Sequence, residues 1–323
     1  MKIILTDAAT ISRGDLDLSV FSKYGEVTIY DITAKSEAVS RIADADAILM
    51  NKTILDADVL SHAKRLRYIG TFATGYNTID IEYCRKHNIT VCNAGTYSTD
   101  AVAETVFAYI LNRFHRVAEY STFVSDGGWI RSGGYLPLEF PIFEMSGRTL
   151  GIVGYGAIGH RVAELARAFR MRVLVYTRTY TRTYTRTPSN EPSVEYVSFE
   201  ELLGESDIIT CHCPLTKDTA GLFDKAAFGQ MKAGAYFINT SRGGVIDESA
   251  LFDALESERL AGAAIDVLTQ EPMQPDCVLY RAKNLTITPH IAWAAYETRQ
   301  RLMRIVEDNL QNFIAGAPTN VIV

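Results

Sequence analysis

Cysteine, basic charge and long apolar runs are all scarce in this chain of 323 residues. Its five cysteines are few and odd in number, which argues against a disulfide framework and predicts a reducing, cytoplasmic setting. No apolar run approaches the roughly 18 residues that span a membrane, and the first apolar stretch is too short for a secretory signal. Lysine and arginine number 32 against 38 acidic residues, a net charge of −6, so we expect no nucleic-acid partner.

The composition and length are those of a folded protein with two domains, because hydrophobic residues make up 47% of the chain and charged residues 22%. Short β-rich runs alternate with amphipathic stretches, a pattern that predicts doubly wound α/β domains with parallel sheets. We expect strands at 2–6, 26–31, 47–50, 67–71, 89–92, 149–153, 171–176, 207–213, 235–239, 262–267 and 285–288. The main helices are expected at 36–43, 56–63, 101–117 and 296–314.

Two stretches fall outside this alternation. A glycine-rich segment from Asp126 to Gly134 has no strong periodicity and is too aromatic for a linker, so we interpret it as a packed arm. The stretch from Thr177 to Thr187 holds nearly three copies of a Thr-Arg-Thr-Tyr unit. Solenoid units run to about 20 residues or more, so we interpret the repeat either as a tandem expansion of a loop or as an artefact of the sequence.

The sequence Gly154-Tyr155-Gly156-Ala157-Ile158-Gly159 follows an expected strand and opens an expected helix. In such a loop the first glycine allows a tight turn, the second lets a pyrophosphate approach the backbone, and the third permits close helix–strand packing. The phosphates then lie at a helix N-terminus, whose free N–H groups favour negative charge. We interpret the loop as a dinucleotide-binding site rather than as a purely structural glycine turn.

An acidic residue is missing from the end of the next expected strand. An Asp or Glu about 20 residues into this unit would bind the ribose 2′-hydroxyl of NAD. The chain has Thr177 and Arg178 there, and no acid before Glu191. A carboxylate would repel a 2′-phosphate, whereas an arginine and hydroxyls attract one. We therefore expect NADP(H) to be favoured. The alternative is that NAD(H) is used and that Arg178 is a solvated loop residue. We expect Arg182 and Arg186 to be solvated loop residues in either case.

Polar residues follow three expected strands in the second half of the chain. They lie in Asn239-Thr240-Ser241-Arg242-Gly243-Gly244, in Ala264-Ile265-Asp266-Val267 with Glu271-Pro272 after it, and in Thr288-Pro289-His290. Ligands of open α/β sheets bind beyond the carboxyl ends of the strands, so we expect these segments to converge on one site.

Taken in order, these motifs resemble the D-2-hydroxyacid dehydrogenase family. The resemblance rests on the glycine loop, on N-T-S-R-G-G, on E-P at 271–272 and on P-H-I-A-W at 289–293, with 74–80 and 212–216 as further matches. Within the family, His-Ile-Ala-Trp at 290–293 is most like the glycerate dehydrogenases, also called hydroxypyruvate or glyoxylate reductases. The resemblance implies a Rossmann-type cofactor domain, 99–291, and a flavodoxin-like substrate-binding domain formed by 1–98 and 292–323.

The resemblance also implies roles that the chemistry of the side chains supports. Arg242 would grip the substrate carboxylate and carbonyl, since a guanidinium fork matches a carboxylate with paired hydrogen bonds. His290 would protonate the carbonyl oxygen as the hydride arrives, because an imidazole titrates near working pH. Glu271 would hold the imidazole and favour its charged form. The alternative for His290 is a purely structural role.

Further residues are assigned by the resemblance alone. Asp266 would meet the nicotinamide carboxamide, with a strand-end cap as the alternative. The other implied cofactor contacts, beyond the three glycines, are Ala157, Ile158, Thr177, Arg178, Cys213, Pro214, Thr240 and Ser241. The implied substrate contacts in the first domain are Asn51, Lys52, Ala73, Thr74 and Gly75.

Two other features were weighed for metal binding and for assembly. Alternation along a strand would put Cys211 and Cys213 on one face and His212 on the other, and no second pair follows at zinc spacing, so we expect no metal site. Trp129 and Tyr135 resemble the family's dimer-forming extension, which predicts a homodimer; packing within the domain is the alternative.

The sequence therefore predicts an NAD(P)H-dependent enzyme that reduces small 2-keto acids, hydroxypyruvate to D-glycerate or glyoxylate to glycolate. D-Lactate and 3-phosphoglycerate dehydrogenases are the enzymatic alternatives. A nucleotide-sensing corepressor or scaffold is the non-enzymatic one, since a fold alone does not fix a function.

Overall fold

The structure is a computed structural model that describes residues 1–177, 187–188 and 194–323. The chain divides into two compact units, which we call unit 1 (Met1–Ser98 with Ala294–Val323) and unit 2 (Thr99–Trp293). The sequence prediction places these boundaries after residues 98 and 291. Within the described residues, no helix is both long and apolar enough to cross a membrane.

Unit 1 is built on a five-stranded parallel sheet with the strand order β2-β1-β3-β4-β5. Its strands are β1 (Lys2–Leu5), β2 (Glu26–Ile29), β3 (Ala47–Met50), β4 (Tyr68–Thr71) and β5 (Thr90–Cys92). Every residue of β3 and β4 is buried, as expected when helices cover both faces of a parallel sheet. This strand order is flavodoxin-like, which confirms the predicted fold class.

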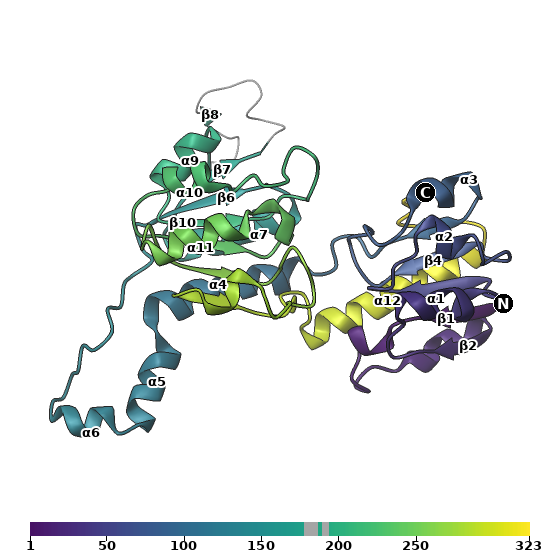
Figure 1. The fold of residues 1–323 in the computed structure, drawn as a ribbon, viewed down its shortest axis with the longest axis horizontal. Coiled ribbons are helices and arrows are strands. Elements are labelled where there is room, and N and C mark those ends of the chain that lie inside the picture. Colours follow the sequence, from purple (N-terminus) through teal and green to yellow (C-terminus); the bar gives the residue numbers. More distant parts are fainter. Residues whose placement is uncertain (178–186, 189–193) are drawn as a thin grey trace. The chain divides into compact units, whose positions relative to one another are not determined.

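The helices of unit 1 come from both ends of the chain. They are η1 (Ala8–Thr10), η2 (Leu18–Tyr24), α1 (Lys35–Ile42), α2 (Ala57–Leu60), α3 (Ile81–Lys86) and α12 (Tyr296–Ile314). Aspartate caps begin three of them: the carboxylates of Asp17, Asp56 and Asp80 accept from the N–H groups of Ser19, Val59 and Tyr83 respectively. Helix α12, yellow in Figure 1, packs on β4, where the rings of Tyr68 and Phe313 lie 4.7 Å apart.

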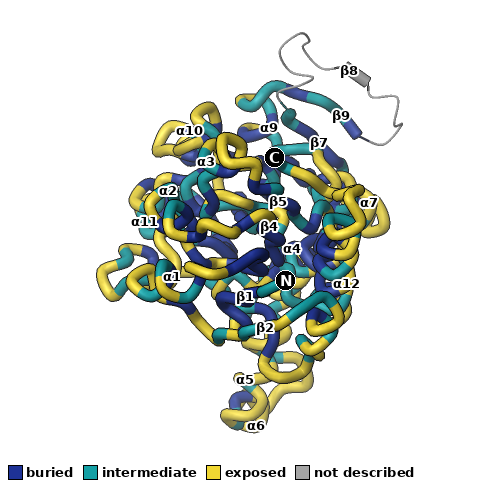
Figure 2. Tube along the Cα trace, turned by 90° about the vertical axis from the view of Figure 1, so that its right-hand side faces the viewer, coloured by how far each residue is buried: buried dark blue, intermediate teal, exposed yellow. Residues whose placement is uncertain are grey.

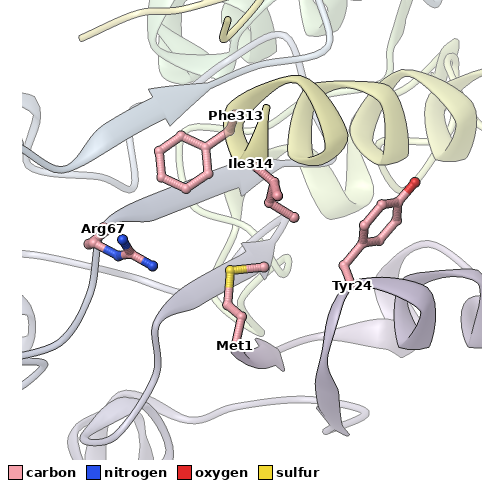
Figure 3. A pocket seen from close by; sticks show the side chains of 5 residues that line it. All are labelled: Met1, Tyr24, Arg67, Phe313 and Ile314. Atoms are coloured by element: carbon pink, nitrogen blue, oxygen red, sulfur yellow. The ribbon is translucent and has the colours of Figure 1, made fainter. Parts of the chain in front are cut away.

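Unit 1 contains a pocket lined by Met1, Tyr24, Arg67, Phe313 and Ile314 (Figure 3). Arg67 immediately precedes β4 and Met1 immediately precedes β1, so this pocket lies at the amino edge of the sheet. The predicted substrate contacts follow the carboxyl ends of β3 and β4 instead. The pocket and the predicted site are therefore at opposite edges of the same sheet.

Unit 2 is built on a sheet with the order β13-β12-β11-β10-β6-β7-β9-β8, in which every neighbouring pair is parallel except β8 with β9. Its strands are β6 (Thr149–Val153), β7 (Arg172–Tyr176), β8 (Thr187–Pro188), β9 (Glu195–Tyr196), β10 (Ile208–Cys211), β11 (Ala235–Asn239), β12 (Leu260–Ile265) and β13 (Leu285–Ile287). The chain order reverses between β6 and β10, and such a switch point is where doubly wound sheets bind ligands.

Helices cover both faces of this sheet. Alternate strand residues such as Ile152 and Ile238 pack with α4 (Thr99–His115) and α7 (Ala157–Ala168) in one core cluster. Their neighbours Val153 and Phe237 pack in a second cluster with α9 (Phe199–Glu205), α10 (Lys225–Gln230) and α11 (Glu248–Glu256). Unit 2 also contains two short helices, η3 (Gly243–Val245) and η4 (Val278–Arg281). Every residue of β6, β10 and β11 is buried.

The segment after α4 forms two further helices, α5 (Val117–Ser125) and α6 (Gly128–Ser132). The sequence predicts a packed arm at 126–134, whereas the structure forms α6 there and leaves the side chains of Trp129 and Ile130 exposed. No residue of α5 is buried (Figure 2). The Tyr135 side chain is fully exposed. Because neither helix presents an apolar face to a core of its own, the segment has no amphipathic period for sequence analysis to detect.

Candidate active site

The three glycines of the 154–159 loop have different surroundings. Gly154 has φ +95°, and a Cβ there would lie 2.6 Å from the Cys213 nitrogen at the end of β10. A Cβ at Gly159, in the first turn of α7, would lie 2.4 Å from the carbonyl oxygen of Gly154. Gly156 is different, because a Cβ there would meet nothing within 4 Å. Gly154 and Gly159 therefore permit close backbone packing, whereas Gly156 leaves open space before helix α7.

That open space fits the pyrophosphate of a dinucleotide. Gly156 is the N-cap of α7 and provides no side-chain cap, so the first turn of the helix keeps N–H groups that a phosphate can accept from. Ala157 and Ile158 are the first two residues of that turn. Thr177 follows β7 and is half-buried, whereas Arg178 lies outside the described residues.

Arg242 is positioned by a turn at the end of β11. Its backbone is extended, and its carbonyl accepts a hydrogen bond from the Asn239 side-chain amide at 3.0 Å. A Cβ at Gly243 would lie 1.9 Å from the Leu268 carbonyl carbon, so only glycine fits there. The Arg242 turn therefore packs directly on the backbone of the loop that leads to Glu271.

His290 and Glu271 form a hydrogen-bonded pair in that neighbourhood. The imidazole Nδ1 lies 2.7 Å from Glu271 Oε2, and both side chains are partly exposed. The other carboxylate oxygen of Glu271, Oε1, accepts from the Leu268 N–H. Because Nδ1 faces a carboxylate, the remaining ring nitrogen of His290, Nε2, is the one that can serve a substrate.

The segment that contains His290 is held by Asp266, which is buried at the end of β12. One carboxylate oxygen accepts from the Thr288 hydroxyl and the Ile291 N–H, and the other from the Ala292 N–H. These bonds support the strand-end cap that was the alternative for Asp266. Its contact with a nicotinamide stays a prediction.

The other predicted cofactor residues cluster at the ends of β10 and β11. The Sγ atoms of Cys211 and Cys213 lie 3.5 Å apart, and the Ser241 hydroxyl is 3.4 Å from Cys211 Sγ. His212 uses Nε2 to bond Thr210, and burial lowers its pKa to about 3, so the ring is neutral. Among the described residues, its Nδ1 and the buried Thr240 hydroxyl have no hydrogen-bond partner. Pro214 is exposed.

The predicted substrate contacts of unit 1 follow β3 and β4, which are neighbours in its sheet. Asp7 organises the first group: its carboxylate accepts from the backbone N–H groups of Asn51, Lys52 and Thr53 at 2.6–2.8 Å. In the second group, the Ala73 carbonyl accepts from the Ala94 N–H. The Thr74 carbonyl accepts from the side-chain amide of residue 93, and the Thr74 hydroxyl donates to the carbonyl of residue 95. Gly75 comes directly after them.

The sequence motifs mark the segments at the strand ends but not the residues that hold those segments in place. Tyr109 on α4 bonds the Thr288 hydroxyl, and Thr105, one turn earlier, bonds the Ala292 carbonyl. Asp7 was likewise not singled out. In each case the side chain occupies an ordinary helix or strand-end position, and its partner lies far away in the sequence.

Comparison with known proteins is consistent with this geometry. Residues 107–292 match the family model described as D-isomer specific 2-hydroxyacid dehydrogenase, NAD binding domain. A hydroxypyruvate reductase from Blautia hydrogenotrophica is 38% identical, and the match covers 100% of this chain and 99% of that protein. A glyoxylate reductase from Thermococcus litoralis is 37% identical over 94% of this chain and 92% of its own. A glycerate dehydrogenase from Methylorubrum extorquens is 35% identical over 97% of both.

Solved structures share the whole architecture. An acyclic imino acid reductase in complex with NADPH and D-Arg superposes with a TM-score of 0.85 at 30% identity, over 100% of both chains. The class of protein defined by the fold and the glycine loop is thus a dinucleotide-dependent dehydrogenase. The chain belongs to the D-isomer-specific 2-hydroxyacid dehydrogenase family, as its motifs predicted.

Proposed function

We propose that this protein reduces hydroxypyruvate or glyoxylate to the corresponding 2-hydroxy acid and favours NADP(H) over NAD(H). The observation that carries the proposal is the His290–Glu271 pair, at 2.7 Å, held at the carboxyl edge of the sheet beside the Arg242 turn. This is the combination of proton donor and carboxylate anchor that reduction of a 2-keto acid needs. The names of its relatives support the choice of substrate.

The roles of the chain's own residues follow from their chemistry. A nicotinamide cofactor, when bound along the 154–159 loop, would supply a hydride, which is two electrons and a proton, for the carbonyl carbon. The Arg242 guanidinium binds the substrate carboxylate with paired N–H donors. As the new C–H bond forms, the C=O π electrons move to oxygen, and His290 donates a proton there to complete the hydroxyl. Glu271 stabilises the protonated imidazole through Nδ1.

Support for NADP(H) comes from the end of β7. The residues after it are Thr177 and Arg178, where a carboxylate would be expected for the ribose hydroxyls of NAD. An arginine neutralises the 2′-phosphate and donates hydrogen bonds to it. One structural neighbour was solved with NADPH. For the remaining contacts we propose Cys213, Pro214, Thr240, Ser241 and Asp266.

Unit 1 is proposed to bind the substrate, through the loops that follow β3 and β4. Asn51 and Lys52 supply polar side chains, and the 73–75 loop supplies backbone N–H groups, suited to a small carboxylate. Asp7 fixes the first loop by three backbone hydrogen bonds. Unit 2 would then be the cofactor domain.

The proposed function is tested by initial rates of reduction of hydroxypyruvate and glyoxylate, each with NADPH and with NADH. Fast turnover with NADPH is the expected outcome. A strong NADH preference would overturn the cofactor assignment and keep the enzyme. Faster reduction of pyruvate or phosphohydroxypyruvate would overturn the substrate assignment. Dinucleotide binding with no turnover on any of the four acids would point to a sensing or scaffold protein.

The protein is further proposed to be a homodimer that assembles through residues 117–143. Large apolar side chains are exposed throughout this segment: Val117, Val124, Trp129, Ile130, Tyr135, Leu136, Leu138, Ile142 and Phe143. An exposed apolar surface of this extent is typical of an interface. Light scattering is expected to give a dimer for the wild type and a monomer for Ile130→Asp combined with Leu136→Asp. A wild-type monomer would overturn the assignment.

A further inference from the structure

The loop that carries His290 has an unusual backbone. His290 itself has φ +57°, in the left-handed region that residues other than glycine seldom adopt. Such a conformation persists only when surrounding contacts impose it. The contacts that fix residues 288–293 therefore determine where the imidazole is.

Those contacts converge on Asp266 from both sides of His290. Before the histidine, the Thr288 hydroxyl donates to Oδ1; after it, the Ile291 N–H donates to Oδ1 and the Ala292 N–H to Oδ2, both at 2.8 Å. Trp293 adds a bond from its indole N–H to the His290 carbonyl at 3.0 Å. The strained residue is thus held between anchored neighbours.

Helix α4 supports the same loop from outside. The Tyr109 hydroxyl lies 2.5 Å from Thr288 Oγ1, and the Thr105 hydroxyl bonds the Ala292 carbonyl. The two residues are four apart and therefore on one face of the helix. Helix α4 begins at Thr99, the first residue of unit 2, and the loop ends at Trp293, its last.

The direction of the hydrogen bonds can be deduced. Thr288 has one hydroxyl proton and gives it to Asp266, because a carboxylate only accepts. Its oxygen must then accept from Tyr109. Burial raises the pKa of Tyr109 to about 12, so this phenol keeps its proton at working pH.

We propose that Tyr109 and Thr288 are positioning residues, which orient Asp266 and thereby fix the His290 loop through the chain Tyr109 Oη–H to Thr288 Oγ1–H to Asp266. Neither needs to touch the substrate. The inference rests on the proposed role of His290. The effect of Tyr109 and Thr288 on the loop, however, can be measured in the absence of turnover. Because both residues belong to one chain of bonds, their substitutions are expected to be non-additive.

Three substitutions separate the hydroxyl groups from the volume they fill. Tyr109→Phe removes the first donor, and Thr288→Val removes the second while keeping the side-chain shape. Thr288→Ser keeps the hydroxyl and is the rescue variant. Tyr236→Phe is the matched control, because this buried tyrosine belongs to the same core cluster as Tyr109 but bonds Thr286 instead of Thr288.

The first measurement is kinetic. From the usual net value of a buried hydrogen bond, Tyr109→Phe is expected to lower kcat about tenfold with little change in KM for the keto acid. Thr288→Val is expected to lower kcat further. The kcat of Thr288→Ser should stay within about twofold to threefold of the wild-type value, and that of Tyr236→Phe should be unchanged. The double variant Tyr109→Phe with Thr288→Val should be no slower than Thr288→Val alone. Multiplicative losses, or equal losses in Tyr109→Phe and Tyr236→Phe, would overturn the proposal.

The second measurement is amide hydrogen exchange of the peptide that spans residues 286–295, in the protein without ligands. Exchange at Ile291 and Ala292 is expected to be about tenfold faster in Tyr109→Phe and Thr288→Val and unchanged in Tyr236→Phe. Unchanged exchange in all three would overturn the positioning role. Faster exchange in a protein that reduces no keto acid would leave the hydrogen-bonded chain in place and count against the proposed function instead.

Discussion

Nδ1 of His290 lies 2.7 Å from Oε2 of Glu271, and the second oxygen of that carboxylate is fixed by the Leu268 N–H. Leu268 in turn packs against Gly243, next to Arg242. Two loops from neighbouring strands are therefore joined through their backbones. The proposed proton donor and the proposed carboxylate anchor depend on the same few backbone contacts, so a change in one is expected to affect the other.

His290→Gln is expected to lower turnover by about 100-fold or more, because glutamine can hydrogen-bond but cannot donate a proton to the developing alkoxide. Dinucleotide affinity, measured by fluorescence titration, should stay near the wild-type value. Glu271→Gln keeps the histidine and is expected to cause a smaller loss. Near-normal turnover in His290→Gln would contradict the acid–base role.

Arg178→Ala is expected to lower the ratio of kcat/KM for NADPH to that for NADH by at least about tenfold, the value of a hydrogen bond to a charged group. Arg182→Ala is the matched control, with the same change of charge and an expected ratio close to wild type. The measurement is initial rate against cofactor concentration at fixed keto acid. An unchanged ratio in Arg178→Ala would remove that residue from the cofactor argument.

The glycine loop offers a test that separates folding from binding. Gly159→Ala places a methyl 2.4 Å from the Gly154 carbonyl oxygen and is expected to destabilise unit 2 by about 1–3 kcal/mol. Gly156→Ala meets nothing within 4 Å, so stability should hold while dinucleotide affinity falls about tenfold or more. Urea unfolding and fluorescence titration measure the two quantities. Gly204→Ala, also in open space, is the control.

Burial lowers the pKa of His212 from its ordinary 6.5 to about 3, which makes folding sensitive to acid. Between these values the unfolded chain binds a proton that the folded chain does not, so stability falls as pH falls. The expected contribution is at most about 1.4 kcal/mol per pH unit. Urea unfolding of the ligand-free protein from pH 7 to pH 4 should give a shallower slope for His212→Gln. The exposed His62→Gln variant should keep the wild-type slope, and equal slopes in all three would contradict the prediction.

The elements of both sheets could be predicted because each is a short apolar run between polar boundaries. The strands at 149–153 and 235–239 and the helix at 296–314 have their expected limits. Helices α5 and α6 could not be predicted, since they bury almost nothing in their own unit. Their apolar residues face outward, which removes the periodicity on which such predictions depend.

The residues of the candidate site likewise divide into those that local sequence patterns predict and those that they do not. Arg242, Glu271 and His290 could be found because each lies in a compact local motif. Tyr109 could not, because it occupies an ordinary apolar position of a long helix and its partner Thr288 is 179 residues away. Only the fold brings such a hydroxyl to the site, and no local pattern records it.

Unit 1 is assembled from both ends of the chain, and this sets the order in which a ribosome can complete the two units. The 195 residues of unit 2 are continuous in the sequence. In unit 1, by contrast, β4 packs against the ring of Phe313, near the C-terminus. Strand β5 likewise depends on Ile322 and Val323, which form backbone hydrogen bonds with Val91. The contacts that the C-terminal residues make with β4 and β5 can therefore form only after the whole of unit 2 has been synthesised. Until those contacts form, the parts of β4 and β5 that Phe313, Ile322 and Val323 cover in the finished fold stay uncovered.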